Sequence, residues 1–172
     1  MLFRSEMLDN VLQYFIDNAP DAVSRAKYSA ERERSIGVGA LGFHAYLQRN
    51  GIAFEGVMAK VANNRIFKHI RTKLNEANLA LGSERGSPAD CAGTGLRFAH
   101  VMAVAPNASS SILMGNTSPS IEPYRANAYR QDTLSGSHLN KNKFLDKILR
   151  EKGLTDEQLQ DTWSSIIAND GS

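Results

Sequence analysis

One short apolar run, Val101 to Ala105, predicts a buried strand in a sequence whose other apolar residues mostly recur at helical spacing. A strand buried alone has unpaired N–H and C=O groups along both edges, and these groups need neighbouring partners. We expect a mostly helical structure with one or two buried strands, an unusual inventory for a free-standing domain. The run therefore suggests that this chain is a piece of a larger structure.

The predicted helices are placed by apolar periodicity and by their termination signals. Leu8, Val11, Leu12 and Phe15 predict an amphipathic helix that ends before Pro20. Further helices are predicted over about Ala40 to Gln48, Val57 to Leu81, and Phe144 to Leu149, and after a capping box over Thr155 to Gln158. In the last of these, Leu159, Trp163 and Ile167 share one face. The stretch from Tyr129 to Asn142 is polar and carries no predicted element, and residues 1–172 show no internal domain boundary.

Charge and cysteine content restrict the classes of function. Twenty basic residues against eighteen acidic ones give a net charge of +2, which favours neither nucleic acid nor an anionic membrane as a partner. The basic segment Lys141 to Lys152 is interrupted by Asp146 and Glu151, so a solvated helix face explains it better than DNA binding. A single cysteine, Cys91, cannot form an internal disulfide and favours the cytoplasm. We expect no membrane span and no signal peptide.

The predicted strand is followed by a turn whose residues suggest an anion-binding site. Pro106-Asn107 ends the apolar run, Ser109, Ser110 and Ser111 follow, and Ile112 to Met114 predict the opening turns of a buried helix. Free N–H groups and the helix dipole at such a helix start favour an anion, and phosphate fits best. The alternative is an ordinary helix cap, because serine is favoured there without any ligand.

The other polar candidates have structural explanations. Gly37, Gly39 and Gly42 match G-x-G-x-x-G, but no βαβ unit surrounds them, so close backbone packing is the preferred interpretation. His44 is expected to be a packed or surface histidine rather than a metal ligand. Cys91 has no nearby base and is expected to be incidental.

Three further residues lie after the serine turn. Glu122 is interpreted as a structural acid that caps a helix or pairs with Arg125. Tyr124 and Tyr129 are expected to have packing roles.

Three stretches together resemble a known family: ERERSIGVGALGFHAYLQ, APNASSSI and NTSPSIEPYRANAY. They are similar to the large (alpha, catalytic) subunit of class I ribonucleotide reductase, and the resemblance extends from about Leu8 to Gly153. It implies an α/β fold in which this chain forms the C-terminal-middle part of a ten-stranded α/β barrel. It also implies an oxidoreductase that reduces ribonucleoside diphosphates to deoxyribonucleoside diphosphates for DNA synthesis, by radical abstraction of the 3′ hydrogen, loss of the 2′ hydroxyl and reduction by a cysteine pair.

The resemblance assigns a role to the serine turn and to no catalytic residue. The residues that it implies for binding the substrate's diphosphate are Pro106, Asn107, Ala108, Ser109, Ser110 and Ser111. The family's radical and redox cysteines have no counterpart here, because Cys91, in SPADCAGTG, matches a variable loop. The ATP-binding cone and the family's tyrosine relay pair also have no match in this chain.

The resemblance also implies partners and cofactors. The expected partners are a ribonucleoside diphosphate, the remaining parts of the large subunit and a small radical-generating subunit. We expect no metal and no cofactor on this chain, whereas the parent enzyme uses a radical from a metal-containing small subunit and an external dithiol. The isolated chain is expected to be inactive. The alternative is a non-enzymatic helical module that binds a phosphate, a nucleotide or another protein.

Overall fold

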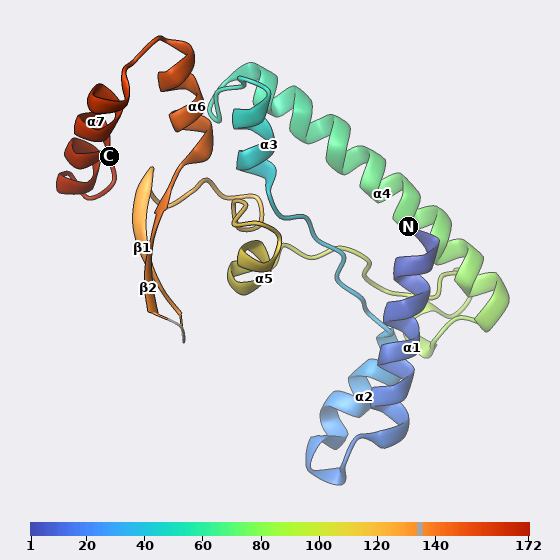
Figure 1. Ribbon diagram of the computed structural model, residues 1–172. Coiled ribbons are helices and arrows are strands. Elements are labelled where there is room, and N and C mark those ends of the chain that lie inside the picture. The colour runs from blue at the N-terminus through green and yellow to red at the C-terminus, as the bar shows by residue number, and fades with distance from the viewer. Residues whose placement is uncertain (134–135) are drawn as a thin grey trace. The chain divides into compact units, whose positions relative to one another are not determined.

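The computed structural model describes residues 1–133 and 136–172, and helices dominate them (Figure 1). The elements, in chain order, are α1 (Leu2–Asn18), η1 (Asp21–Val23), α2 (Ser24–Glu33), α3 (Phe43–Arg49), α4 (Val57–Arg85), η2 (Ala89–Cys91), α5 (Ala108–Leu113), β1 (Ala128–Thr133), β2 (Gly136–Lys141), α6 (Lys143–Glu151) and α7 (Asp156–Ala168). None of the helices among the described residues is both long and apolar enough to cross a membrane.

The chain forms two compact units, each with its own packing. The first unit comprises Met1–Ala40 and Val57–Pro106, and the second comprises Leu41–Gly56 and Asn107–Ser172. We describe each unit by itself. The absence of an internal domain boundary stays a prediction.

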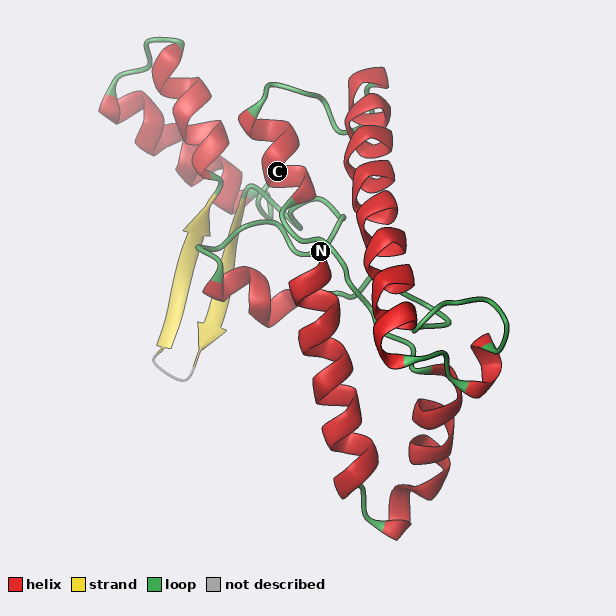
Figure 2. Cartoon of the chain, turned by 90° about the vertical axis from the view of Figure 1, so that its right-hand side faces the viewer, coloured by secondary structure: helices red, strands yellow, loops and turns green. Residues whose placement is uncertain are grey.

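The core of the first unit forms where the C-terminal half of α4 meets the extended segments beside it. Phe98, Leu74 and Leu81 are fully buried there, together with Ile36, Val38 and Val101. Figure 2 shows α1 alongside this half of α4. The predicted apolar face of α4 is confirmed at Leu74 and Leu81, whereas Val61 near its start is 51% exposed. The helix also continues to Arg85, beyond the predicted end.

The buried face of α1 includes only part of the predicted apolar one. The helix ends at Asn18 as expected, and Leu8 packs against the core while Leu12 is half-buried. Val11 and Phe15 are exposed, however, and Ser5, Asp9 and Ile16 are buried. A carboxylate buried as Asp9 is requires charged or hydrogen-bonding partners.

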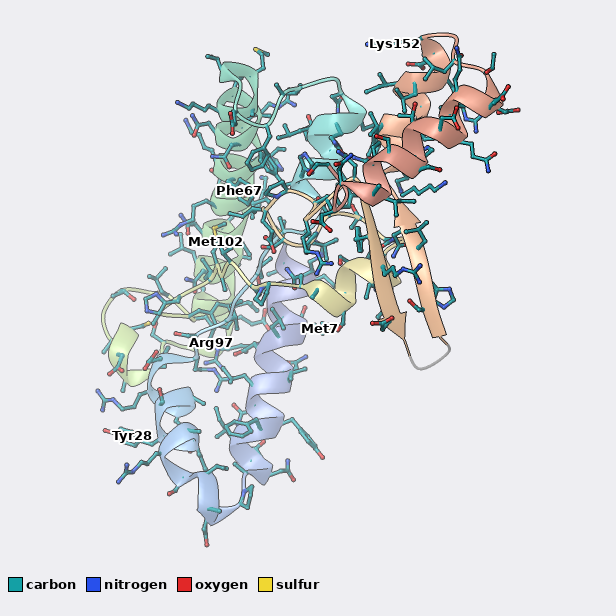
Figure 3. All side chains as sticks on the ribbon, turned by 90° about the vertical axis from the view of Figure 1, so that its left-hand side faces the viewer. Met7, Tyr28, Phe67, Arg97, Met102 and Lys152 are labelled. Atoms are coloured by element: carbon teal, nitrogen blue, oxygen red, sulfur yellow. The ribbon has the colours of Figure 1, made fainter. Side chains whose placement is uncertain are left out.

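Three arginines surround the Asp9 carboxylate. The guanidinium of Arg34, itself buried, lies 2.7 Å away, that of Arg85 lies 3.0 Å away and that of Arg97 lies 3.2 Å away. Figure 3 labels Arg97, which approaches from the segment after α4. Burial alone would raise the pKa of Asp9, but the hydrogen bonds from Arg34 and Arg85 and the charges of Arg34 and Arg97 outweigh it and lower the pKa. The cluster therefore joins α1, the end of α2 and the end of α4.

The predicted strand at Val101 to Ala105 is reduced to a single bridge. Val38 pairs with Met102 in parallel, with Val38 N donating to Val101 O at 3.1 Å and Ala103 N donating to Val38 O at 3.4 Å. Val101 is buried, but Val104 is 71% exposed, so the prediction of a buried strand is wrong beyond Val101. Among the described residues no further strand flanks this pair. Parallel pairing is slightly less stable per residue than antiparallel pairing, and here no neighbouring strand supplies further hydrogen bonds. The ten-stranded barrel stays an expectation.

Close backbone packing explains two of the three glycines. A Cβ added to Gly37 would lie 2.8 Å from the Cβ of Ala103, and one added to Gly39 would lie 2.6 Å from the carbonyl oxygen of Ala103. Both distances are shorter than carbon and oxygen atoms tolerate without movement. The interpretation of these glycines as close-packing residues is confirmed.

These contacts predict different outcomes for two similar substitutions. Gly37→Ala and Gly39→Ala should each lower the free energy of unfolding by about 1–3 kcal/mol, because each added methyl group overpacks the site. Ala103→Gly should restore stability to Gly37→Ala, since it removes the clashing methyl group. It should not restore Gly39→Ala, whose clash is with backbone. Urea denaturation of the single and double variants measures this, and equal rescue of both would contradict the packing described.

The second unit contains a β-hairpin in the polar stretch where no element is predicted. β1 and β2 pair antiparallel, from Ala128 opposite Lys141 to Thr133 opposite Gly136 (Figure 2). Most of β2 is exposed. The hairpin therefore follows from backbone pairing rather than from an apolar face that the sequence could reveal.

The helices of the second unit begin and end close to the predicted signals. The capping box of α7 is confirmed, with Gln158 N donating to Thr155 Oγ1 at 3.3 Å and Thr155 N donating to Gln158 Oε1 at 2.9 Å. On the predicted face of α7, Leu159 and Trp163 are buried but Ile167 is 42% exposed. Gly153, after α6, has a φ of 84°, which suits the glycine predicted to stop that helix.

Candidate functional site

The serine turn forms the start of α5. Asn107 adopts the left-handed conformation with φ of 48°, and the first intrahelical bond runs from Ser111 N to Asn107 O at 2.9 Å. The N–H groups of Ala108, Ser109 and Ser110 precede that bond and have no acceptor within the helix. The side chain of Asn107 does not cap them. This end of α5 therefore has the free N–H groups that an anion requires.

The three serines do not share one environment. Ser109 and Ser110 are exposed, so their hydroxyl groups are accessible to a ligand. Ser111 is buried, and its hydroxyl donates to Ala108 O at 2.7 Å. Its contribution to α5 is structural in this conformation.

The apolar residues after the serines are placed differently from the prediction. Ile112 and Leu113 end α5 instead of opening a buried helix, and Leu113 and Met114 are 83% and 66% exposed. The expectation of a buried helix is wrong. The helix is six residues long because Gly115 and Asn116, with φ of 78° and 56°, turn the chain away.

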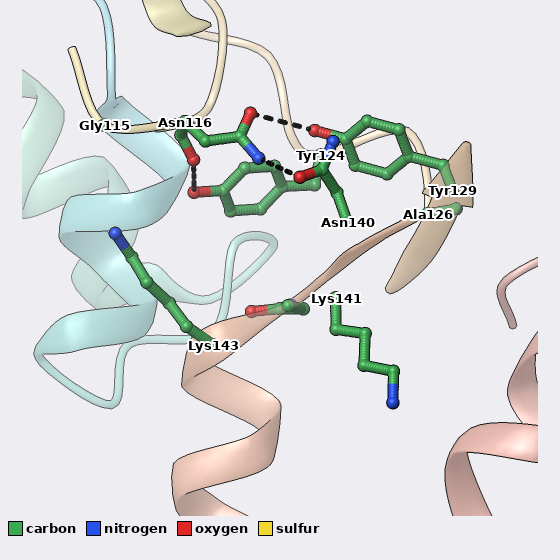
Figure 4. A pocket seen from close by; sticks show the side chains of 9 residues that line it. Gly115, Asn116, Tyr124, Ala126, Tyr129, Asn140, Lys141 and Lys143 are labelled. Carbon is green, nitrogen blue, oxygen red and sulfur yellow. Dashed lines mark hydrogen bonds between the residues drawn. The ribbon is translucent and has the colours of Figure 1, made fainter. Parts of the chain in front are cut away.

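Asn116 connects the segment after α5 to the hairpin. Its side-chain amide donates to Asn140 Oδ1 at 2.7 Å, and its Oδ1 accepts from the Tyr129 hydroxyl at 3.4 Å. The Tyr124 hydroxyl donates to Asn116 O at 3.4 Å. Together they line a cavity of about 70 Å³ (Figure 4). The packing roles predicted for Tyr124 and Tyr129 are confirmed, and burial raises the pKa of Tyr124.

A second hollow of about 260 Å³ runs along α5 itself. Ala108 and Ser111 of α5 line it together with Arg125, Tyr129 and Arg130. The guanidinium of Arg125 lies 5.9 Å from the centre of the Tyr129 ring. The two arginines bring positive charge beside α5, and no pattern in the sequence connected them with the serine turn.

The segment after the turn also caps α3. Gly42 N donates to Ser118 O at 2.8 Å, and Ala45 N donates to the Ser118 hydroxyl at 3.0 Å. His44 Nδ1 accepts from Tyr124 N at 3.0 Å, and burial lowers the pKa of this histidine. His44 is therefore a packed residue, which was one of the two expectations for it.

The remaining candidates supply no reactive group. Cys91 is buried, and burial, followed by the charge of Asp90, raises the pKa of its thiol. Glu122 is exposed and makes no ion pair with Arg125 in the part of the chain that the structure describes. Within the same residues, no three His, Cys, Asp or Glu side chains gather where they could hold a metal ion.

Comparisons with known proteins agree on one family. The model of the family described as "Ribonucleotide reductase, barrel domain" matches residues 4–91 and 88–170. The chain is 58% identical over 167 residues to the ribonucleoside-diphosphate reductase large subunit of Invertebrate iridescent virus 6, and 54% identical over 165 residues to that of Invertebrate iridescent virus 3. These alignments cover 97% and 96% of this chain.

A solved structure gives the same result. The class Id ribonucleotide reductase alpha subunit of Actinobacillus ureae superposes with a TM-score of 0.85 at 40% identity, over 99% of this chain. The chain spans only a minor part of each relative, namely 17% and 26% of the two viral subunits and 31% of the bacterial chain.

Proposed function

Because this chain belongs to the ribonucleotide reductase barrel-domain family, we propose that it acts as a segment of a ribonucleoside-diphosphate reductase large subunit and anchors the substrate's diphosphate. The observation that carries the anchor role is the start of α5, where three N–H groups have no acceptor within the helix and Ser109 and Ser110 are exposed. The residues proposed to form it are Pro106, Asn107, Ala108, Ser109, Ser110 and Ser111.

The anchor holds the diphosphate mainly through backbone groups. N–H groups at a helix start carry partial positive charge and donate to phosphate oxygens, so a lysine is not required. Ser109 and Ser110 add hydroxyl donors. Arg125 and Arg130, in the hollow along α5, add long-range attraction for the anion.

The redox chemistry lies elsewhere in the assembly. In the parent reaction a cysteine radical removes the 3′ hydrogen and a cysteine pair reduces the 2′ position, whereas this chain has only the buried Cys91. In this proposal the chain contributes binding and orientation of the substrate. The remaining large-subunit segments, the small subunit and an external dithiol supply the rest of the reaction.

A cytoplasmic location fits these partners. The non-enzymatic module is not favoured, since the family and the relatives point to the reductase.

An NMR titration tests the anchor. Addition of a ribonucleoside diphosphate to the 15N-labelled chain should shift the amide signals of Ala108, Ser109 and Ser110 most. The double variant Ser109→Ala/Ser110→Ala should bind about thirtyfold more weakly, because each hydroxyl contributes a hydrogen bond worth about 1 kcal/mol. Ser164→Ala, at an exposed serine of α7, is the matched control and should bind like the parent. Shifts confined to other amides would rule out the anchor.

A further inference from the structure

Helix α6 has an apolar face that the second unit covers only in part. Phe144, Leu145, Ile148 and Leu149 lie at the spacing of one helix face, which a globular protein normally buries. Yet no residue of α6 is fully buried, and Ile148 is 45% exposed. The packing of α6 against α3 and α7 thus leaves part of this apolar face available for a further contact.

The exposed part of this face borders a groove between α3 and α6. It holds about 530 Å³ and is lined by Gln48, Arg49, Gly51, Lys143, Phe144, Lys147, Ile148 and Glu151. We call it the α3–α6 groove. All of these residues belong to the second unit, so the groove is formed within one unit.

The charges around the groove are mostly positive. Arg49, Lys143 and Lys147 are exposed cations, and Glu151 is the single acid among the lining residues. Glu151 lies 3.6 Å from Lys147, a distance that leaves this exposed pair loosely held. The Lys143 ammonium lies 5.6 Å from the centre of the Phe144 ring, so positive charge and apolar surface are adjacent in the groove. A ligand that fits must therefore offer both apolar side chains and negative charge.

We propose that the α3–α6 groove docks a short acidic peptide segment of another protein, whose apolar side chains contact Phe144 and Ile148 and whose carboxylates face Arg49, Lys143 and Lys147. A basic segment would meet three like charges, and a small anion would leave the apolar floor uncovered. A short peptide buries less area than a stable protein–protein interface, so we expect a transient contact, with a dissociation constant on the order of micromolar or weaker. Its residues are distinct from Pro106 to Ser111, so the proposal does not depend on the diphosphate anchor.

Fluorescence polarisation of three labelled peptides with the full chain tests this. The first is a twelve-residue peptide with leucine and phenylalanine at helical spacing and aspartate or glutamate elsewhere. In the second, lysine replaces every acidic residue, and in the third, serine replaces every apolar one. The first peptide should bind saturably, and the other two should bind at least about tenfold more weakly.

Charge reversal locates the binding site. Lys143→Glu/Lys147→Glu should weaken binding of the first peptide by at least about tenfold, because two attractions become repulsions. Lys152→Glu is the matched control, since Lys152 follows α6 outside the groove, and it should bind like the parent (Figure 3). Circular dichroism confirms that each variant is folded, and Ile148→Ser provides a second test that leaves the charges unchanged. Absence of saturable binding, equal binding of the lysine peptide, or equal loss in Lys152→Glu would overturn the proposal.

Discussion

Asp9→Asn is expected to lower the free energy of unfolding of the first unit by about 3–5 kcal/mol, as removal of one partner from a buried ion cluster typically does. The substitution keeps the size of the side chain but removes the negative charge that Arg34, Arg85 and Arg97 share. Arg34 is itself buried, so its charge would lose its ionic partner without gaining water. Urea denaturation followed by far-ultraviolet circular dichroism measures the change.

Asp17→Asn is the matched control on the same helix. Asp17 is exposed and accepts a hydrogen bond from the Gln13 side chain at 2.8 Å, so its replacement should change stability by less than about 0.5 kcal/mol. If Asp9→Asn were as mild as Asp17→Asn, the arginine cluster would not hold α1 in place.

The lowered pKa of Asp9 sets the direction of the pH dependence. A carboxyl group whose pKa is lower in the folded than in the unfolded state stabilises the protein above its unfolded pKa, near 3.8. That contribution is lost as the pH falls through the folded pKa. Acid should therefore destabilise the parent more than Asp9→Asn, and the difference between the two should shrink as the pH falls below the unfolded pKa toward the lower folded pKa.

Phe98→Ala is expected to cost about 3–5 kcal/mol, because it removes a fully buried aromatic ring and leaves a cavity. The backbone around the ring is fixed, which limits collapse into that cavity. Asn78 Oδ1 accepts from Phe98 N and from Arg97 N, both at 2.8 Å, and Asn78 Nδ2 donates to Phe98 O at 3.0 Å. Leu74 and Leu81 of α4 belong to the same core.

The control for this loss is Phe3→Ala. Phe3 lies on α1 with 77% of its surface exposed, so the same deletion should change stability by less than about 0.5 kcal/mol. The same denaturation experiment reports both variants. Equal effects at the two positions would show that Phe98 is not at the centre of the core.

Helix ends were the features that the sequence predicted best. The end of α1 before Pro20, the capping box at Thr155 and the glycine stop at Gly153 all depend on local backbone chemistry, which neighbouring residues decide. The close packing of Gly37 and Gly39 was also predictable, although the partner, Ala103, was not.

The features that the sequence did not reveal depend on contacts between residues that are far apart in the chain. The burial of Asp9 on α1 depends on arginines that lie 25 to 88 positions away in the chain. In the hairpin, the side chains of β2 are mostly exposed, so this strand lacks the alternating apolar pattern that identifies a strand. Conversely, the apolar run after Val101 resembles a strand but has too few backbone partners among the described residues.

The candidate site likewise has one part that the sequence predicted and another that it did not. The free N–H groups at the start of α5 follow from a helix start after Pro106-Asn107, and this part was predictable. The commitment of the Ser111 hydroxyl to Ala108 and the arginines beside α5 depend on the folded backbone. The diphosphate role of Pro106 to Ser111 is a proposal supported by the family and by this geometry.

The most direct test measures nucleotide reduction by a hybrid enzyme. In the hybrid, this chain replaces the matching segment of the Invertebrate iridescent virus 6 large subunit, to which it is 58% identical, and the small subunit of that virus is added. We predict an active hybrid in which Ser109→Ala/Ser110→Ala raises the KM for the ribonucleoside diphosphate about thirtyfold, while Ser164→Ala leaves it unchanged. A folded hybrid without activity, or a KM that the double variant does not change, would contradict the assignment of Pro106 to Ser111 as the diphosphate anchor.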